Sequence, residues 1–397
     1  MNILFLSFHY PPDLGAGSFR SEALANALLA SNDHVRLDIL TACPNRYRSF
    51  ISPAPAHEYG ERHHIQRVEL PRYRGGLLAQ ALAAGRYALA ARAAARHRKY
   101  DLVVATSSRI MTAALGASIA RGQGVPLYLD IRDIFSQNLP ELVARPLRKP
   151  LRWLLERIED YPLKTAAKVN LNSGGFAEHF RHRYPEQAFS FHSNGVDDLF
   201  RLPASAPRRP RGNHKPVEVV YAGNIGAAQA LHHIIPPLAE RLGSTVRLRL
   251  YGDGNRLEAL REALKRSGAR NVEIFSPVPR DQLPAIYQSA DVLFLHLAQW
   301  RSCNFVLPSK LFEYIATGKP LWAGTAGWAR RFILESGVNA AIFPPNDAEQ
   351  AVAALRHLDL TRTDTSAFSR AFDRRAIMRR MAGDIIGVAV PGGPAQP

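Results

Sequence analysis

The sequence predicts an α/β protein with two open parallel sheets, each flanked by helices in the Rossmann manner. Short apolar runs rich in β-branched residues alternate with helical patterns along almost the whole chain, which is typical of βαβ units. A basic, proline-rich stretch without periodicity, residues 203–216, separates two such series. A chain of 397 residues is long enough for two domains with a core each.

The first series predicts strands near 2–8, 35–40, 65–69, 101–105, 126–130, 168–171 and 189–192. Helices are predicted between them, near 18–30, 77–98, 109–121, 148–160 and 174–182. We therefore expect a first Rossmann-like domain over 1–198 and a linker over 199–216.

The second series predicts strands at 217–221, 246–251, 272–275, 291–295 and 320–323. These strands indicate a second Rossmann-like domain over 217–365, followed by a helix over 366–387 that crosses back to the first domain. The Gly/Pro-rich end, 388–397, is expected to be disordered. Because parallel sheets bind ligands at the carboxyl ends of their strands, the cleft between the domains is the expected site.

Composition excludes several classes of protein. No run of about 18 apolar residues predicts a membrane span, and the N-terminus lacks the basic start of a signal peptide. Cys43 and Cys303 lie too far apart for a zinc motif or a disulfide framework. We expect a cytoplasmic protein.

The chain is strongly basic, with 51 Lys and Arg against 34 Asp and Glu and a net charge of +17. Such a charge attracts nucleic acid, anionic lipid and phosphorylated substrates. It also serves plain solubility, and composition alone leaves these alternatives open.

In the first domain, Gly15 and Gly17 lie in the loop between the first strand and the first helix. They permit close approach of a ligand to the backbone, and the helix start offers free N–H groups to an anion. Arg132 and Asp133 follow a later buried strand that ends in Asp130. Arg132 suits a phosphate, and Asp133 suits a base or the orientation of an acceptor hydroxyl. An internal salt bridge that fixes the loop is the alternative.

In the second domain, three consecutive strands end in small or turn-forming residues at one edge. Gly223, Asn224 and Gly226 precede a helix near 228–241 and suit a diphosphate cradle of backbone N–H groups. Gly252 ends the next strand, and Val278 follows the third. Turn geometry explains part of this pattern, but the repetition favours a ligand along that edge.

The most specific segment is 304–321. Pro308 suits the first turn of a helix, where Ser309 and Lys310 follow. The positive charge of Lys310 opposes the helix dipole there and therefore favours a nearby anion. Glu313, about one turn further, is placed to accept both hydroxyls of a ribose. The buried side of this helix is expected to hold Leu311, Ile315 and Ala316.

These residues resemble glycosyltransferases of family 4, which have the two-domain GT-B fold. The resemblance runs from residue 2 to about 386, through a Tyr-Pro-Pro…Gly…Arg opening, an Asn-Gly-Val-Asp boundary at 194–197, the Gly-Asn-Ile-Gly and Gly-Asp-Gly strand ends, a Phe…Pro-Val segment and the acidic helix. It is greatest for the bacterial branch that builds O-antigen and capsule repeats, including N-acetyl-fucosamine transferases, because that branch carries Arg-Asp after the mid-domain strand and Pro-Ser-Lys-x-Phe-Glu-Tyr.

The resemblance implies a site. Glu313 corresponds to the ribose-binding second Glu of the family motif, Gly15 and Gly226 to glycines near the diphosphate, and Val278 to the residue that meets the base. The donor-binding set implied in full is Gly15, Gly17, Gly223, Asn224, Gly226, Gly252, Val278, Ser309, Lys310, Leu311 and Glu313.

The sequence also departs from the family pattern. Phe305 stands where the first Glu of the motif is expected, and Ala227 follows Gly226 without the usual basic residue. Arg132 and Asp133 replace the common histidine of the first domain and become the catalytic candidates. Lys310 is the candidate for the phosphate charge, and Ser302 and Asn304 are candidates for the sugar.

The implied reaction is a retaining transfer without bound metal or cofactor, from a UDP-linked or other nucleotide sugar to a polyprenyl-diphosphate-linked or saccharide acceptor. An N-acetylated hexosamine or deoxyhexosamine is the expected sugar. Arginines alternating with apolar residues over 145–157 suggest docking of the first domain on the anionic inner-membrane surface. Solvated faces over a buried leucine stripe (Leu151, Leu154, Leu155, Ile158) explain the same pattern.

Two rivals stay open on sequence grounds. A nucleotide-sugar 2-epimerase of the same architecture would change the donor without an acceptor. Binding of nucleic acid is suggested by charge alone, since no binding module or interleaved aromatic pattern accompanies it.

Overall fold

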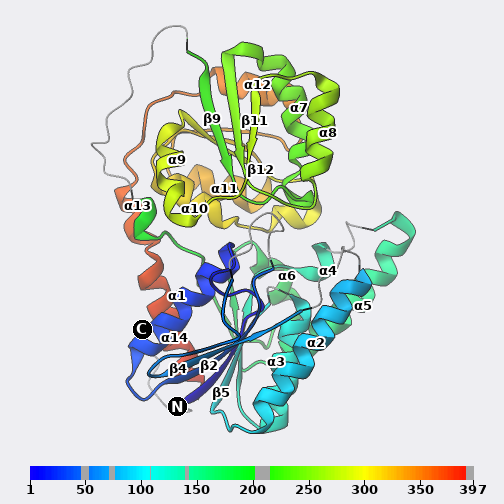
Figure 1. The fold of residues 1–397 in the computed structure, drawn as a ribbon, viewed down its shortest axis with the longest axis vertical. Helices are drawn as coiled ribbons and strands as arrows, with labels where there is room; N and C mark the ends of the chain where they lie inside the picture. Colours follow the sequence, from blue (N-terminus) through cyan, green and yellow to red (C-terminus); the bar gives the residue numbers. More distant parts are fainter. Residues whose placement is uncertain (46–52, 71–76, 108, 139–142, 202–214, 390–397) are drawn as a thin grey trace. The chain divides into compact units, whose positions relative to one another are not determined.

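The computed structural model describes residues 1–45, 53–70, 77–107, 109–138, 143–201 and 215–389. They form two α/β units; in Figure 1 the first is blue to green with its last helix in red, and the second is green to orange. The first unit holds the described residues up to Asn194 and the last helix from Arg374, and the second runs from Gly195 to Asp373. The predicted fold class is confirmed, because each unit is built on a parallel sheet covered by helices.

The first unit contains an eight-stranded sheet in the order β3-β4-β2-β1-β5-β6-β7-β8. Its strands are β1 (Asn2–Leu6), β2 (Arg36–Ala42), β3 (His57–Tyr59), β4 (His63–Val68), β5 (Leu102–Thr106), β6 (Leu127–Ile131), β7 (Lys168–Leu171) and β8 (Phe189–Ser190). All pairs are parallel except β3 with β4. The antiparallel edge strand β3 was not predicted, because its three residues give no readable alternation.

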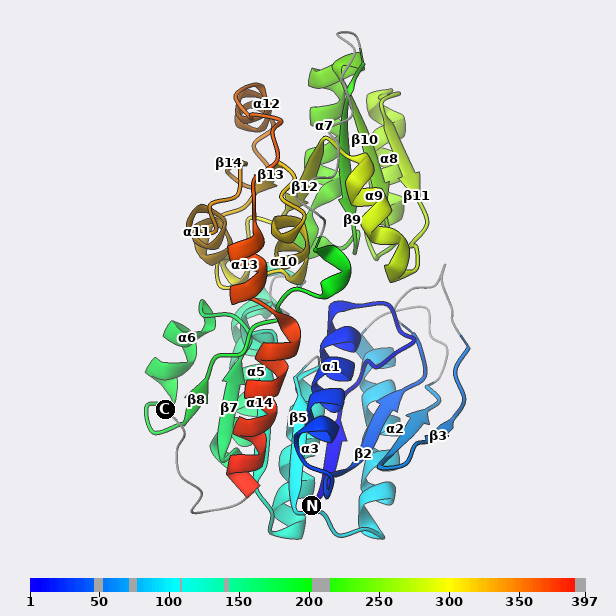
Figure 2. The same ribbon diagram turned by 90° about the vertical axis from the view of Figure 1, so that its left-hand side faces the viewer.

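Helices cover both faces of this sheet, with bounds α1 (Ala16–Ser31), α2 (Leu77–Arg96), α3 (Ile110–Gln123), α4 (Phe135–Asn138), α5 (Arg145–Thr165), α6 (Phe176–Arg183) and α14 (Arg374–Ala389). The two ribbon views show α1 and α14 together on one face, and α2, α3 and α5 on the other (Figures 1 and 2). The end of the chain thus completes the first unit.

The second unit contains a six-stranded parallel sheet in the order β11-β10-β9-β12-β13-β14. Its strands are β9 (Val217–Ala222), β10 (Val246–Tyr251), β11 (Val272–Phe275), β12 (Val292–His296), β13 (Leu321–Gly324) and β14 (Ala340–Phe343). Strand β14 was not predicted, since two alanines begin it and β-branched residues are scarce.

Alternating residues of the second sheet face two separate apolar layers. Its helices are α7 (Leu231–Leu242), α8 (Leu257–Ser267), α9 (Leu283–Ser289), α10 (Ser309–Ala316), α11 (Gly327–Glu335), α12 (Ala348–Arg356) and α13 (Ser366–Ala371). Val219 packs with α7, α8 and α12, whereas its neighbour Val220 packs with α9, α10, α11 and α13. Both faces are buried, which explains the near-continuous apolar runs of the central strands.

The boundary between the units differs from the prediction. The division falls between Asn194 and Gly195, rather than after residue 198. The single helix expected over 366–387 is two helices, α13 and α14. They are separated because Val196 forms a parallel bridge with Asp373 and donates its N–H to the Phe372 carbonyl at 2.7 Å. Most of the expected linker, 202–214, and the tail, 390–397, lie outside the described residues.

Candidate functional site

The connections of the second sheet reverse direction between β9 and β12. In such sheets ligands bind beyond the carboxyl ends of the strands at this switch point. Helix α10 packs there, because the Tyr314 hydroxyl accepts a hydrogen bond from the N–H of Ala222, the last residue of β9, at 3.1 Å. The predicted helix of Lys310 and Glu313 therefore lies at the end of the central strand.

Lys310 is partly buried and lies against an aromatic ring. Its Nζ donates to the Tyr221 hydroxyl at 2.8 Å and lies 4.0 Å from the centre of that ring. Burial lowers the pKa of Lys310 to about 7, and the nearby Glu313 carboxylate opposes the shift. Since its hydrogen-bond partner is a neutral phenol, the ammonium retains strong attraction for an anion.

Glu313 lies one turn along α10, with 12% of its side chain exposed. The Tyr287 hydroxyl donates to its Oε2 at 3.2 Å, and the Arg280 Nη2 lies 3.7 Å from its Oε1. Arg280 is also paired with Asp197. The carboxylate is thus held in one orientation while keeping acceptor capacity for ligand hydroxyls.

The glycines at the strand ends have a packing role as well. A Cβ on Gly252 (φ 156°) would lie 1.9 Å from the Gly223 carbonyl oxygen, and one on Gly254 would lie 2.4 Å from the Ile225 oxygen. A Cβ on Gly223 would meet Lys310 Nζ at 2.4 Å. The loops after β9 and β10 therefore need glycine to pack on each other and on Lys310. The glycine pattern is weaker support for a ligand than the sequence indicated.

Two other residues that were predicted to bind the sugar donor make hydrogen bonds within the protein. Asn224 donates from Nδ2 to the Gln229 Oε1 at 2.8 Å, beside Gly226. Leu311 is fully buried in the core, and its N–H donates to the Pro308 carbonyl at 3.0 Å. The side chain and N–H of Leu311 are therefore engaged within the protein. Its predicted place on the buried side of the helix is confirmed, and its role in donor binding stays a prediction.

The remaining candidates of the second unit differ in their exposure to solvent. Ser309 opens α10, and Val278 follows β11; both are partly buried. Ser302 is 2% exposed, and its Oγ has no hydrogen-bond partner among the described residues, whereas Asn304 is exposed. Of the two sugar candidates, only Asn304 presents its side chain to solvent.

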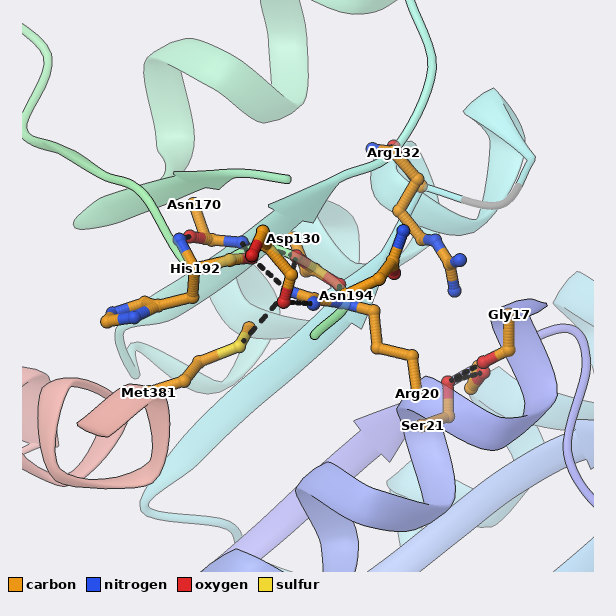
Figure 3. Close-up of polar contacts among 12 residues, drawn as sticks. Gly17, Arg20, Ser21, Asp130, Arg132, Asn170, His192, Asn194 and Met381 are labelled. Carbon is orange, nitrogen blue, oxygen red and sulfur yellow. Dashed lines mark hydrogen bonds and ion pairs between the residues drawn. The ribbon is translucent and has the colours of Figure 1, made fainter. Parts of the chain in front are cut away.

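In the first unit, Asp130 is a structural residue (Figure 3). Arg20 of α1 donates to both of its oxygens at 2.9 Å, and Asn170 donates to Oδ1 at 2.7 Å. Arg20 also donates to the His192 and Ser193 carbonyls at 2.8 and 2.7 Å. This buried network joins α1, β6, β7 and the segment after β8, so the internal salt bridge is the correct interpretation of Asp130.

Arg132 differs from Arg20, because Arg20 is fully buried and Arg132 is only partly buried. The backbone N–H of Arg132 donates to the Ser107 Oγ at 3.0 Å. The Nη1 of its guanidinium is buried without a hydrogen-bond partner among the described residues. A Cβ on Gly17 would lie 3.0 Å from that Nη1. Burial lowers the pKa of Arg132 to about 10, and Asp130 opposes the shift. The guanidinium therefore has unused donor capacity beside the start of α1.

The N-terminus of α1 provides backbone donors beside this guanidinium. Gly15 is the N-cap, no side chain caps the helix, and its first turn holds no acidic residue. Gly17 adjoins Arg132 in Figure 3. The first unit thus brings Gly15, Gly17 and Arg132 together as an arrangement suited to an anion. Asp133 is partly buried and lines a small cavity with Ser107 and Glu159.

Sequence reasoning missed several residues of these sites. Tyr221, Arg280 and Tyr287 were not singled out, because each becomes functional only through its distance to Lys310 or Glu313. Among the described residues, no group of three or more His, Cys, Asp or Glu side chains is placed to hold a metal ion. None of the described helices is both long and apolar enough to cross a membrane.

Two family descriptions match successive parts of the chain. Residues 15–195 match the glycosyl transferase 4-like domain, and residues 216–359 match the glycosyl transferases group 1. The chain belongs to the family 4 glycosyltransferases. Its two sheets are the two domains of the GT-B fold, and the α10 site lies in the part that matches group 1.

Known proteins similar to this glycosyltransferase include WcaI of Escherichia coli (strain K12), described as a colanic acid biosynthesis glycosyl transferase. The two are 28% identical over 180 residues, which spans 43% of each chain.

Solved structures show the same fold. Sucrose-phosphate synthase from Thermosynechococcus elongatus superposes with a TM-score of 0.68 at 14% identity, covering 98% of this chain and 96% of that one. WaaG, a glycosyltransferase involved in lipopolysaccharide biosynthesis, gives 0.64 at 16% identity and coverage of 98% and 100%. Anabaena Alr3699/HepE in complex with UDP-glucose gives 0.57 at 17% identity and coverage of 98% and 97%.

Proposed function

We propose that this glycosyltransferase moves a sugar from a nucleoside-diphosphate sugar to a lipid-linked or saccharide acceptor during synthesis of a bacterial surface polysaccharide. The relatives support this proposal, since WcaI and WaaG are described in colanic acid and lipopolysaccharide biosynthesis, and HepE is in complex with UDP-glucose. A UDP-linked N-acetylated hexosamine or deoxyhexosamine is the donor we propose.

The observation that carries the proposal is the pair of opposite charges on α10. Lys310, which donates to the Tyr221 hydroxyl, suits a diphosphate, and Glu313, which accepts from the Tyr287 hydroxyl, suits ribose hydroxyls. The two residues are three positions apart on one helix, so their side chains point from the same face. A nucleoside diphosphate has its hydroxyls and its negative charge at a comparable separation.

In the proposed reaction, the bond between the anomeric carbon and the diphosphate oxygen breaks, and a bond to the acceptor oxygen forms with retention of configuration. Lys310 stabilises the charge that develops on the leaving diphosphate, without a bound metal. The acceptor hydroxyl loses its proton to the leaving phosphate. Arg132 and the α1 N-terminus are assigned an anionic group of the substrates, and Asp133 is assigned orientation of the acceptor hydroxyl.

The test measures recognition of the nucleoside and of the diphosphate separately. Binding of uridine and of UDP is measured by calorimetry for the wild type, Glu313→Gln and Lys310→Met. Glu313→Gln should weaken both ligands by roughly tenfold to a hundredfold, because each lost hydrogen bond involves a charged group. Lys310→Met should weaken UDP alone, because uridine carries no phosphate.

Glu335→Gln, in an exposed ion pair with Arg331 on α11, is the matched control and should bind both ligands normally. Equal affinity of all variants for UDP would contradict the proposed site. Incubation with a UDP-sugar alone, followed by addition of acceptor, separates transfer from epimerisation: a transferase consumes the donor in step with the acceptor, whereas an epimerase converts the donor without it.

A further inference from the structure

The first unit exposes large apolar side chains on the face covered by α2, α3 and α5. On α5, Leu147, Trp153 and Leu154 are 57%, 60% and 49% exposed, and on α2, Leu82 and Leu89 are 69% and 70% exposed. Of the leucine stripe that the sequence allowed on α5, Leu155 is buried, Leu151 and Ile158 are partly buried, and Leu154 is exposed. Helices α2 and α5 each pack against α3 on this face, and exposed apolar groups gathered on one face mark an interaction surface.

The exposed groups of α5 follow one helical stripe. Leu147, Leu154 and Tyr161 are spaced seven residues apart, and each spacing is close to two turns. Arg157 and Lys164 each lie three residues beyond Leu154 and Tyr161, on the same side of the helix. The Arg157 guanidinium lies 5.3 Å from the Trp153 ring. Apolar and cationic groups therefore alternate along a single exposed line.

The same three helices are strongly basic. They carry ten Lys or Arg residues, three in α2, one in α3 and six in α5, against three acidic residues, all in α5. Glu159 is buried, and Asp160 accepts hydrogen bonds from Arg183 and Tyr184. Only Glu156 opposes the positive field without such a contact among those described.

We propose that this face docks on an anionic lipid bilayer, through Leu82, Leu89, Leu147, Trp153, Leu154 and Tyr161 and the cations among them. The six apolar residues and their cations are called the α2–α5 surface. A bilayer interface accepts apolar side chains and tryptophan below the headgroups, while arginine and lysine extend to the phosphates. A second copy of the chain would bring two positive faces together, and nucleic acid offers no apolar phase.

Docking would place the first unit at the surface where a lipid-linked acceptor resides, a consequence that rests on the proposed function. The docking itself does not, because it depends on helix faces remote in sequence from Lys310 and Glu313. Binding to lipid and transfer of sugar are therefore measured separately.

The experiment is sedimentation of the full chain with vesicles of phosphatidylethanolamine and phosphatidylglycerol, and with neutral phosphatidylcholine vesicles. The wild type should bind the anionic vesicles, and binding should fall with salt. Lys149→Gln with Arg157→Gln should lower the partition coefficient about fivefold per cation. Leu154→Gln, and Trp153→Gln separately, should each lower it by roughly tenfold.

Matched controls lie in the second unit. Leu334, 64% exposed on α11, gives Leu334→Gln, and the exposed pair Lys265 and Arg266 on α8 gives the double Gln variant. Both controls should bind vesicles as the wild type does, and all variants should melt at the wild-type temperature. Equal loss in Leu154→Gln and Leu334→Gln, or equal binding to neutral vesicles, would overturn the proposal.

Two further outcomes are decisive. Binding to double-stranded DNA without binding to vesicles would assign the face to nucleic acid and overturn lipid docking. Vesicle binding that depends on Leu154, in a protein that neither binds UDP nor transfers sugar, would uphold docking and reject the proposed function. Transfer to a water-soluble acceptor should be the same in Leu154→Gln and in the wild type.

Discussion

The Nζ of Lys310 lies 2.8 Å from the Tyr221 hydroxyl oxygen and 4.0 Å from the centre of the Tyr221 ring. An ammonium over a ring face gains attraction from the ring quadrupole. Desolvation lowers the pKa of Lys310 to about 7, and the Glu313 carboxylate opposes that shift. The lysine is thus poised to take up a proton when an anion binds.

This relationship predicts a pH-dependent affinity for UDP. A bound diphosphate raises the pKa of Lys310, so binding takes up a proton when the pH lies above the pKa of the free protein, about 7. Affinity should fall as the pH rises from 7 to 9, by up to about tenfold per pH unit. Calorimetry in buffers of different ionisation enthalpy measures the proton uptake directly.

Lys310→Met should abolish the pH dependence, while Lys265→Met, an exposed residue of α8, should leave it unchanged. The free protein gives a second check. Because the folded pKa of Lys310 lies below its unfolded value of 10.5, the unfolded state binds more protons between these values, and stability should rise with pH there. A wild-type affinity that is flat from pH 7 to 9 would contradict the lowered pKa of Lys310.

The Arg20–Asp130 pair predicts a stability effect in the first unit. Removal of one partner leaves the other charge buried, so Asp130→Asn or Arg20→Met should each lower the free energy of unfolding by about 3–5 kcal/mol. The double variant should lose less than the sum of the two. Urea unfolding measures these values.

Acid should also lower the free energy of unfolding, because it protonates Asp130. Although burial opposes it, Arg20 holds the pKa of Asp130 below its usual value. The stability from this pair is therefore complete above the unfolded pKa of 3.8 and is lost as the pH falls through the lower folded pKa. Additive effects of the two single substitutions would show that the residues do not act as a pair.

Unlike substitution of Arg20 or Asp130, substitution of Arg132 should not destabilise the protein. Its Nη1 is buried and has no hydrogen-bond partner within the described part of the chain, so Arg132→Gln relieves a desolvated charge and should leave stability unchanged or raised. The same variant should lower kcat/KM for transfer by roughly tenfold to a hundredfold, if an anion of the substrates uses this donor. A fall in stability with full activity would identify Arg132 as purely structural; Arg266→Gln on α8 is the control.

The close approach of Gly252 to the Gly223 carbonyl predicts that a side chain at position 252 destabilises the second unit. Gly252→Ala places a Cβ 1.9 Å from the Gly223 oxygen at φ 156°, and should lower the free energy of unfolding by about 3 kcal/mol. Gly383→Ala is the matched control, because its Cβ meets nothing within 4 Å and it lies within α14. It should stabilise the protein by about 0.5–1 kcal/mol. Similar effects of both substitutions would refute the packing role.

Long elements with clear periodicity were predictable from the sequence. The central strands β1, β5, β9 and β12 are buried on both faces and therefore appear as uninterrupted apolar runs. The edge strands β3 and β14 were missed, since partial burial removes that pattern. The break between α13 and α14 was also missed, because it depends on the pairing of Val196 with Asp373, which are far apart in the chain.

The candidate site divides in the same way. Lys310 and Glu313 are three positions apart on one helix, so helical geometry by itself placed them together, as the sequence predicted. The sequence could not show that Asp130 is a structural residue whereas Asp133 remains a catalytic candidate, because their partners come from other elements. For the same reason it could not show how completely Leu311 is buried in the core.

The sequence by itself determined the two α/β units, the family and the helix that carries Lys310 and Glu313, since these depend on local periodicity and on motifs along the chain. Tertiary structure decided which charges are satisfied. The Arg20 side chain and the Arg132 Nη1 are both buried in the first unit, yet Arg20 is neutralised by Asp130, whereas the Arg132 Nη1 has no hydrogen-bond partner among the described residues. Only the distances between elements distant in sequence set that difference, because the cost of a buried charge depends on the groups that surround it.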